Sequence, residues 1–481
     1  MGNVLNGLEP RDVFHWFAEI SRIPRGSRNE RRIAEYVVSF AKQRGLHSYM
    51  DDLYNVIITK PGSKGCEELP PVLLECHTDM VCVSAPGVQH DFSNDPIGFV
   101  REGDVLRAKG TSLGADNGVS VAMLLALLDR ADIQHPPLEC LFATQEELGL
   151  LGVKHLDMGK IHARRAIGLD AGFEGVFCKG TSTKYSYELR LDVHREAFEG
   201  QAYRLLIDGL RGGMEGVMMA KERVSAAQVS ARALLHLQRT FALRLEDICV
   251  HSRGIPERCE AFFRARPEDG AALCEAVAAL EGGLRKELQK SEPGLCLRIA
   301  PQEPRGVPLS AQDSAGVIAF LNAFPWRGRG RDVENLTQIT SFVTMRDMGM
   351  DEGSLHLKAT VSAETRSAAE AIDDLFWLFG RLFGVRVVEK GVEPGWEPLD
   401  VSPMRDTMVS AYEELFGRKP YVKVSHGDND CSELYRRIPG MDIITTAATY
   451  YDFHTPNEYL ELPSVGKVYR LVQRTLEKLC D

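Results

Sequence analysis

Apolar residues recur at helical spacing over residues 10–45 and again in several later parts of the chain. Pro24 and Gly26 interrupt the first of these patterns, so two helices are expected there. The same spacing predicts further helices over residues 119–128, 226–237, 271–288, 311–323, 368–382, 403–415 and 464–479.

Short apolar runs between these helices predict β-strands. The run at residues 72–76 is apolar enough to be buried on both faces of a sheet. Further strands are expected at residues 55–59, 138–144, 166–169, 185–193, 259–264, 295–299, 340–345, 355–361 and 443–446. Residues 264–270 and 327–332 lack such a pattern and are predicted to be loops or lobe edges.

The order of these elements predicts an α/β fold with two domains. Strands separated by helices indicate a mostly parallel sheet with helices on both faces. This alternation occupies residues 1–185 and returns over residues 392–481. Residues 186–391 differ and predict an inserted α+β domain of two similar lobes. With 481 residues the chain also exceeds what one hydrophobic core usually serves.

Composition excludes several classes of partner. The formal charge of −11, without a basic patch, argues against nucleic-acid binding. No apolar run approaches the roughly 20 residues of a membrane helix, and the N-terminus has no secretory pattern. Asn6 also fails the myristoylation motif that Gly2 would open. The eleven cysteines are scattered without C-x-x-C spacing, so a cytoplasmic protein with reduced, mostly buried thiols is expected.

Acidic and imidazole side chains follow the predicted strands where each strand ends. His77 and Asp79 come directly after the strand at 72–76, and because they are two residues apart, Asp79 can lie beside His77 and orient its ring. Asp116 stands between two glycines before an apolar helix, and glycine permits backbone angles that would project this carboxylate into a cleft.

Two more strand ends and a late turn add further candidates. Glu146 and Glu147 follow the strand at 138–144, and adjacent carboxylates are costly to bring together unless a cation neutralises one. Asp170 ends the strand at 166–169, and His454 lies in a turn near the C-terminus. Each alone is more often a cap or a surface residue. Together they predict a metal site, because ligands in open α/β sheets bind outside the carboxyl ends of strands.

In order and spacing these segments resemble the aminoacylhistidine dipeptidases (Xaa-His dipeptidases), within the wider clan of dinuclear zinc aminoacylases and carboxypeptidases. The resemblance runs along nearly the whole chain. It is carried by HTDMV at 77–81, GADNG at 114–118, EELG at 146–149, LD at 169–170 and HTPNE at 454–458, with PGW at 394–396 and PGMD at 439–442.

The resemblance implies a centre of two divalent cations with five ligands: His77, Asp116, Glu147, Asp170 and His454. Asp116 would bridge the two cations, with His77 and Asp170 completing one site. Glu147 and His454 would complete the other. Zinc suits this mixed imidazole and carboxylate set, and manganese or cobalt would also serve.

The resemblance also implies a catalytic role for two neighbours of these ligands and a class of reaction. Glu146 would be the general base and Asp79 would support His77. The expected activity is hydrolysis of a dipeptide, Xaa-His or similar, or of a related acyl-amino acid. A homodimer formed through the inserted lid domain is the expected assembly.

The inserted domain departs from the family where substrate-facing groups are expected. Met214 replaces a histidine that would donate to the substrate carbonyl, Arg253 replaces an amide, and Phe342 and Val343 stand where asparagine is usual. Arg366 matches the family and could clamp a substrate carboxylate.

Two explanations of these departures stay open. If the alignment slips in this region, one of three histidines could supply the missing donor: His194, His251 or His426. Of these His426 is the best placed, because it returns in the catalytic half, although a structural loop role is as good an interpretation. Otherwise the chain keeps its metal centre with a changed substrate preference, a reduced rate, or the role of a weakly active protein that binds peptides or amino acids.

Overall fold

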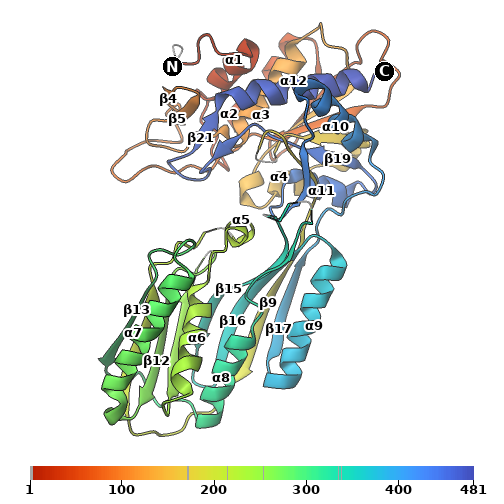
Figure 1. The fold of residues 1–481 in the computed structure, drawn as a ribbon. Coiled ribbons are helices and arrows are strands. Elements are labelled where there is room, and N and C mark those ends of the chain that lie inside the picture. Colours follow the sequence, from red (N-terminus) through yellow and green to blue (C-terminus); the bar gives the residue numbers. More distant parts are fainter. Residues whose placement is uncertain (1–3, 171–172, 214, 253, 334, 337) are drawn as a thin grey trace. The chain divides into compact units, whose positions relative to one another are not determined.

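The computed structural model describes residues 4–170, 173–213, 215–252, 254–333, 335–336 and 338–481. The chain divides into two compact units. Unit 1 comprises Met1–Thr181 and Trp396–Asp481, and unit 2 comprises Ser182–Gly395. Figure 1 shows unit 1 built from both ends of the sequence colour scale and unit 2 from its middle. Among the helices of the described ranges, none is long and apolar enough to cross a membrane.

Unit 1 is organised around an eight-stranded sheet in the order β1-β2-β6-β3-β7-β19-β8-β18. Strand β3 runs parallel to both β6 and β7, β7 is parallel to β19, and β8 is parallel to β18. The remaining pairings are antiparallel. The predicted α/β fold is therefore confirmed, with a mixed sheet whose centre is parallel. The strands are β1 (His47–Met50), β2 (Val56–Lys60), β3 (Val72–His77), β6 (Leu138–Ala143), β7 (Arg165–Gly168), β8 (Val176–Thr181), β18 (Tyr421–Ser425) and β19 (Asp442–Thr445).

Helices cover both faces of this sheet, and a small second sheet in the order β20-β21-β5-β4 completes the unit. Its strands are β4 (Phe99–Glu102), β5 (Val105–Ala108), β20 (Tyr450–Tyr451) and β21 (Tyr459–Glu461). The helices of unit 1 are α1 (Arg11–Ile20), α2 (Arg31–Gln43), α3 (Ala115–Asp129), α4 (Leu151–His155), α10 (Pro403–Phe416), α11 (Asp430–Arg437) and α12 (Leu462–Lys478).

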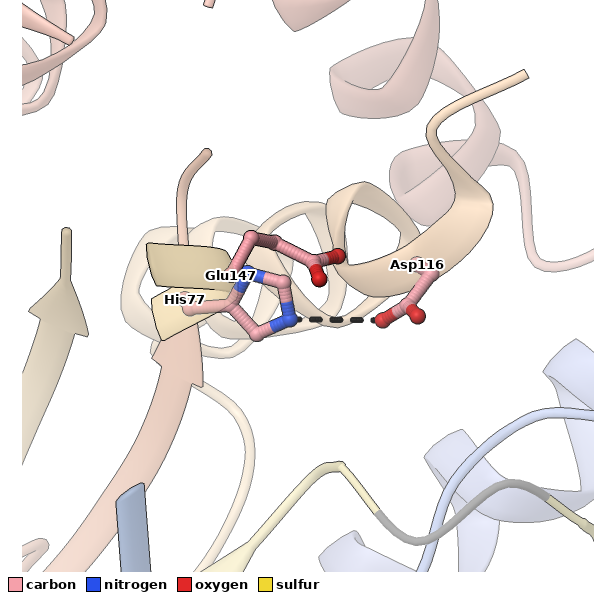
Figure 2. A group of neighbouring side chains, drawn as sticks. All are labelled: His77, Asp116 and Glu147. Carbon is pink, nitrogen blue, oxygen red and sulfur yellow. Dashed lines mark hydrogen bonds and ion pairs between the residues drawn. The ribbon is translucent and has the colours of Figure 1, made fainter. Parts of the chain in front are cut away.

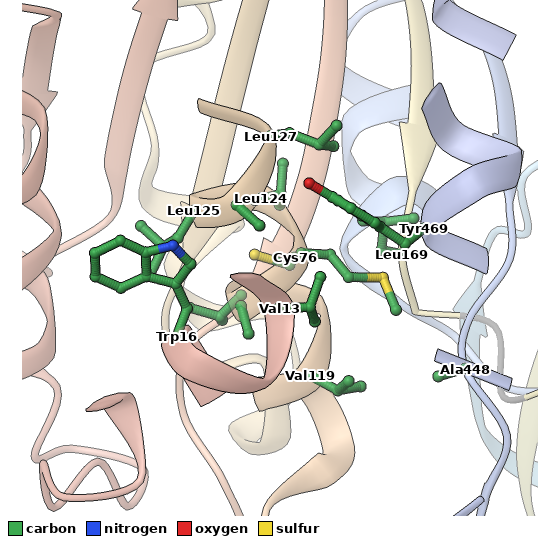
Figure 3. Packing of buried hydrophobic residues seen from close by; sticks show 14 of the residues in the cluster. Val13, Trp16, Cys76, Val119, Leu124, Leu125, Leu127, Leu169, Ala448 and Tyr469 are labelled. Carbon is green, nitrogen blue, oxygen red and sulfur yellow. The ribbon is translucent and has the colours of Figure 1, made fainter. Parts of the chain in front are cut away.

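Helix α3 lies inside the main core of unit 1. Apart from Ser120, its side chains from Val119 to Leu128 are apolar on every side, which is why this part of the helix is buried all round. In Figure 3, Val119 and Leu124 of α3 lie among Val13 of α1 and Tyr469 of α12. Every residue of β3 is buried, as the sequence predicts, because alternate residues enter cores on opposite faces of the sheet.

Unit 2 contains a nine-stranded sheet in which every pairing between named strands is antiparallel. The order β13-β10-β12-β11 is joined to β15-β16-β9-β17 through a short β11–β15 pairing, and β14 pairs with β15. The strands are β9 (Thr183–Asp192), β10 (Gln201–Asp208), β11 (Arg244–His251), β12 (Cys259–Ala265), β13 (Cys296–Gln302), β14 (Arg327–Arg331), β15 (Ile339–Met350), β16 (Ser354–Ala363) and β17 (Arg386–Glu393).

Four long helices pack along this sheet and make its two halves alike (Figure 1). Helices α6 and α7 contact the β13-to-β11 half, α9 contacts the other half, and α8 contacts both α6 and α9. This is the α+β arrangement that the sequence predicts for the inserted segment. The helices of unit 2 are α5 (Glu215–Ala220), α6 (Ala226–Gln238), α7 (Gly270–Glu287), α8 (Ala311–Ala323) and α9 (Arg366–Phe383).

Two expectations from the sequence are wrong. Of the two alternatives for residues 327–332, a loop or a lobe edge, the loop is wrong: residues 327–331 form strand β14, whose main chain pairs with β15 although its Arg-Gly run has no apolar alternation. The cysteines are not all free thiols, since Cys66 and Cys480 form a disulfide with their Cα atoms 5.8 Å apart. These two residues are 414 positions apart, so no local spacing reveals the pair. The other nine cysteines are free, and five of them are buried.

Candidate metal centre

The parallel centre of the unit 1 sheet brings three strand ends to one edge. Strand β3 lies between β6 and β7 and runs parallel to both. His77 at the end of β3, Glu147 just beyond β6 and Asp170 just beyond β7 therefore meet at this edge. The start of α3 is fastened to the same edge, because Asn117 Nδ2 and Ser120 Oγ donate to the Leu169 carbonyl at 2.8 and 2.6 Å.

The carboxylate of Asp116 lies between two imidazoles. Its Oδ1 is 3.3 Å from Nε2 of His77, and its Oδ2 is 3.4 Å from Nε2 of His454. Nε2 of His454 is also 2.7 Å from Oε1 of Glu147. Figure 2 shows His77, Asp116 and Glu147 converging, with ligand atoms that all lie within 4.8 Å of one another. One carboxylate thus faces two separate sets of nitrogen and oxygen donors.

Asp170 joins this group through a tyrosine that sequence reasoning did not identify. The buried hydroxyl of Tyr450 donates to Asp170 Oδ1 at 3.3 Å and to Asp116 Oδ1 at 3.4 Å. Tyr450 stands in β20, only four residues before His454. The structure thereby brings together all five side chains that the sequence predicts as ligands, with Tyr450 fixing two of the carboxylates.

Asp79 lies on the far side of the His77 ring. Its Oδ1 is 3.4 Å from Nδ1 of His77, so the ring stands between two carboxylates. The same carboxylate accepts a hydrogen bond from Ser27 Oγ at 2.8 Å and from the backbone N–H of Glu146 at 3.1 Å. Asp79 therefore links the end of β3 to the turn that carries Glu146, beyond the His77 contact that the spacing predicts.

Burial and neighbouring charges shift the pKa values of the acids and imidazoles in this group. Burial, together with the nearby charge of Asp116, raises the pKa of Asp170 to about 7. Burial also raises the pKa of Glu146 well above its usual range. Burial alone would lower the pKa of His454, but hydrogen bonds to Asp116 and Glu147 outweigh it and raise that pKa to about 10.

The pKa values of Asp116 and His77, at the middle of the site, shift in opposite directions. Burial opposes ionisation of Asp116, yet hydrogen bonds from His454 and His77 hold the pKa of this carboxyl well below its usual range. Burial opposes the charged form of His77, but its contacts with Asp116 and Asp79 raise the pKa of its ring well above the usual value. Histidine protons thus supply the positive charge that these carboxylates require. Two imidazoles and two further carboxylates around a central Asp116 fit divalent cations that would take the place of these protons.

Two acids beneath the centre also escaped sequence reasoning. Glu75 lies in β3 two residues before His77, and burial raises its pKa to about 8, assisted by the charge of Asp170. Cys431 Sγ lies 3.4 Å from Glu75 Oε2. The neighbouring Asp430 is 1% exposed, and its carboxylate oxygens have no hydrogen-bond partner among the described residues. A charged residue inside an apolar strand was the signal available for Glu75, whereas nothing local distinguishes Asp430.

Of the four predicted substrate-binding residues, the structure describes only Arg366 and His426. Met214 and Arg253 lie outside the described residues. Arg366 begins α9 and pairs with Glu370 at 2.9 Å, and His426 is half-buried just after β18. Among the alternative donors, His194 is exposed and its Nδ1 lies 3.2 Å from Asp313 Oδ2, while His251 ends β11.

The residues at the expected asparagine position are apolar and buried. Phe342 packs in a small cluster with Met219, Ile255 and Ile339, and Val343 enters the main core of unit 2. Their packing shows that these substitutions belong to the hydrophobic interior of unit 2.

A family model for peptidase family M20/M25/M40 matches residues 73–478, which include all of the candidate ligands. The chain belongs to this peptidase family. It is 30% identical to the cytosol non-specific dipeptidase of Escherichia coli (strain K12) over 485 residues, covering 99% of each chain. The resemblance to dipeptidases noted from the motifs is thereby confirmed.

Solved structures of other peptidases share this fold. The aminoacylhistidine dipeptidase from Vibrio alginolyticus is 27% identical, with 98% of each chain covered and a TM-score of 0.84. The aminopeptidase PepT from Bacillus cereus is 16% identical, with 98% of this chain and 100% of that chain covered and a TM-score of 0.58, and it supports the fold alone. The α/β unit with an inserted α+β unit is therefore a fold that this chain shares with solved peptidases.

Proposed function

We propose that this protein is a dinuclear metallopeptidase of the cytoplasm that hydrolyses dipeptides or closely related acyl-amino acids. The observation that carries the proposal is the Asp116 carboxylate, whose two oxygens face His77 on one side and His454 on the other. Such a carboxylate can bridge two cations, each completed by one further acid. Asp170 would serve the His77 site and Glu147 the His454 site, as the family motifs imply.

The residues around this centre have distinct roles in the proposed reaction. Two bound divalent cations, zinc in our proposal, would supply polarisation of the scissile carbonyl and acidification of a water molecule. Glu146 stands next to a ligand without being one, so it is free to take the proton of that water and pass it to the leaving amine. Asp79 holds the His77 ring and the Glu146 backbone in fixed relation.

The dipeptide preference is supported by the relatives. The Escherichia coli relative is described as a non-specific dipeptidase, and the Vibrio alginolyticus structure as an aminoacylhistidine dipeptidase. We therefore propose small peptides, Xaa-His among them, as substrates. Arg366 and His426 remain proposed substrate contacts. The apolar packing of Phe342, in place of an amide, favours a second candidate: a protein that keeps the metals but binds peptides or amino acids with little turnover.

A metal-controlled activity screen tests the proposal. The purified full chain, loaded with zinc or manganese, is expected to hydrolyse members of a panel of dipeptides and acyl-amino acids. Chelator treatment should abolish this activity, and restoring the metal should recover it. Absence of turnover by the metal-loaded protein across the whole panel would contradict the proposed function. Tight peptide binding in calorimetry without turnover would instead establish the second candidate.

The proposed assembly is a homodimer formed through unit 2. Strand β17 ends the nine-stranded sheet, and Val388 on this strand is 53% exposed. Helix α9, beside β17 in Figure 1, carries Trp377 and Leu382, which are 67% and 65% exposed. An edge strand flanked by exposed apolar side chains can pair with the same strand of a second copy across a two-fold axis.

Charge introduced on this surface is expected to separate the dimer. We expect the double variant Trp377→Glu, Leu382→Glu to sediment as a monomer where the native chain sediments as a dimer, because carboxylates would be buried at the interface. Val401→Glu is the matched control, since Val401 is also apolar and 78% exposed but lies in unit 1. An unchanged dimer in the double variant would place the interface elsewhere.

A further inference from the structure

We propose that two buried residues of opposite charge, Arg25 and Glu458, are positioning residues that hold Asp116 in its place between the two halves of the centre. The inference rests on the proposed function, because Asp116 is there the shared metal ligand. Among the described residues, the side chains of Arg25 and Glu458 hydrogen-bond to backbone groups and not to the side chains of the candidate ligands. Both act on the main chain that carries Asp116.

The carboxylate of Glu458 accepts hydrogen bonds from four backbone N–H groups. Its Oε2 accepts from Leu113 and Gly114 at 2.7 and 2.9 Å. Its Oε1 accepts from Ala115 and Asp116 at 2.8 and 3.2 Å. These four groups precede or open α3, and the side chain that receives them is 2% exposed. The backbone of Asp116 is therefore fixed by a carboxylate that comes from more than 300 residues further along the chain.

The same turn carries His454, four residues before Glu458. The backbone N–H of Glu458 donates to the Thr455 carbonyl at 3.2 Å, so the two residues belong to one short, internally bonded segment. Glu458 accepts a hydrogen bond from the Asp116 backbone, while His454 faces the Asp116 carboxylate. The distance between the His454 ring and this carboxylate is therefore set by a few bonds within one short segment. Glu458 thus sets the spacing between one imidazole and the central carboxylate.

Arg25 performs the matching task for the His77 side. Its Nη1 donates to the carbonyls of Thr78 and Asp79 at 2.9 and 3.4 Å, and its Nη2 donates to the Gly114 carbonyl at 2.6 Å. The guanidinium therefore ties the segment that follows His77 to the segment that precedes Asp116. A planar group with several fixed donors suits this task, whereas a lysine ammonium carries its three donors on one nitrogen and lacks this fixed fork.

The two glycines around Asp116 leave room for this guanidinium. A Cβ atom on Gly118 would lie 2.4 Å from Nη2 of Arg25 and 3.0 Å from its Cζ. A Cβ atom on Gly114 would lie 2.6 Å from the same Nη2 and 2.7 Å from Sδ of Met80. Gly114 has a positive φ of 68°, as the sequence suggests for a residue that turns the chain, but Gly118 does not. Space for Arg25 therefore explains the second glycine of the GADNG motif.

The test compares metal affinity with stability in full-length variants. Glu458→Gln keeps the size of the side chain but replaces one acceptor oxygen by an amide that faces N–H donors. Arg25→Lys keeps the charge but loses the planar fork. Each is expected to weaken zinc binding by about 10–100-fold in a chelator competition assay, as groups that orient metal ligands typically do. Gly118→Ala, which displaces Arg25 without changing any charge, is expected to act in the same direction.

Matched controls separate positioning from a general loss of stability. Glu461→Gln and Arg22→Lys change the same residue types three positions away and should bind zinc as the native chain does. Leu124→Ala, a cavity variant in the buried part of α3, should lower the melting temperature of the metal-free protein without an equal loss of zinc affinity. Positioning is overturned if Glu458→Gln and Gly118→Ala bind zinc as tightly as Leu124→Ala does. If the native chain itself binds neither zinc nor manganese, the proposed function fails instead.

Discussion

Replacement of Glu146 by glutamine is expected to lower kcat for a dipeptide by about 10²–10⁴-fold, the usual contribution of a general base. Glutamine fills nearly the same volume but cannot accept the proton of the attacking water. The backbone of Glu146 would still donate to Asp79, so the surrounding turn should keep its shape. Steady-state kinetics on the metal-loaded variant measure the loss, and mass spectrometry of the bound metal should show native metal content.

The neighbouring carboxylate provides the sharpest control for this prediction. Glu147→Gln changes the same chemical group one position along the chain, yet Glu147 lies 2.7 Å from His454 and within the group of candidate ligands. We expect that variant to lose bound metal, with activity recovering in part at high metal concentration. If Glu146→Gln kept kcat within tenfold of the native value, its role as general base would be wrong.

Removal of the central carboxylate should have the largest effect on the metal centre itself. We expect zinc at one hundred times its dissociation constant to stabilise the native chain by about 2.7 kcal/mol against unfolding. Asp116→Ala should show almost none of this gain at the same zinc concentration, because both proposed cations lose their shared ligand. Thermal or chemical unfolding with and without zinc measures the difference, and peptide hydrolysis should fall with it.

An exposed acid tests whether the effect is specific. Asp52→Ala removes a carboxylate from the same unit whose side chain is 81% exposed and which pairs with His155 rather than with the centre. Its zinc-dependent stabilisation should equal that of the native chain. Equal stabilisation of Asp116→Ala and the native chain would show that zinc binds elsewhere.

The parts of the fold that the sequence predicts well are those whose own side chains decide the structure. Strand β3 is an apolar run buried on both faces, and α3 is an apolar helix buried all round, so composition alone indicates both. The residues that end β3, β6 and β7 meet because parallel neighbours end at one edge of a sheet. A purely local pattern therefore points to His77, Glu147 and Asp170.

Two strands of unit 2 could not be predicted from the sequence, because their residues show no apolar alternation. In β14 the Arg-Gly run carries no apolar alternation, and its backbone nevertheless pairs with β15. In β17 the adjacent Val387 and Val388 are both exposed, so no period of two marks the strand. Pairing partners supply the structure in both cases.

The residues that support the centre escaped prediction for a similar reason. Arg25 works through carbonyl groups 53 and 89 residues away, and Glu458 through N–H groups more than 300 residues away. Main-chain groups exist at every position, so no residue type in the sequence identifies them as partners. Tyr450 is comparable, since its hydroxyl gains meaning only when Asp116 and Asp170 lie beside it.

The point where the chain leaves unit 1 has a consequence for how such proteins diversify. The backbone N–H of Thr181 donates to the Trp396 carbonyl at 2.9 Å, and the backbone N–H of Trp396 donates to Thr181 Oγ1 at 3.0 Å. The chain therefore leaves unit 1 and returns to it at neighbouring points. The free energy of closing a loop rises only slowly with its length. The segment from Ser182 to Gly395 is therefore an insertion that is joined to unit 1 at two neighbouring points of the chain. Recombination at both of these points would replace this segment while the sheet that carries the candidate ligands stays intact.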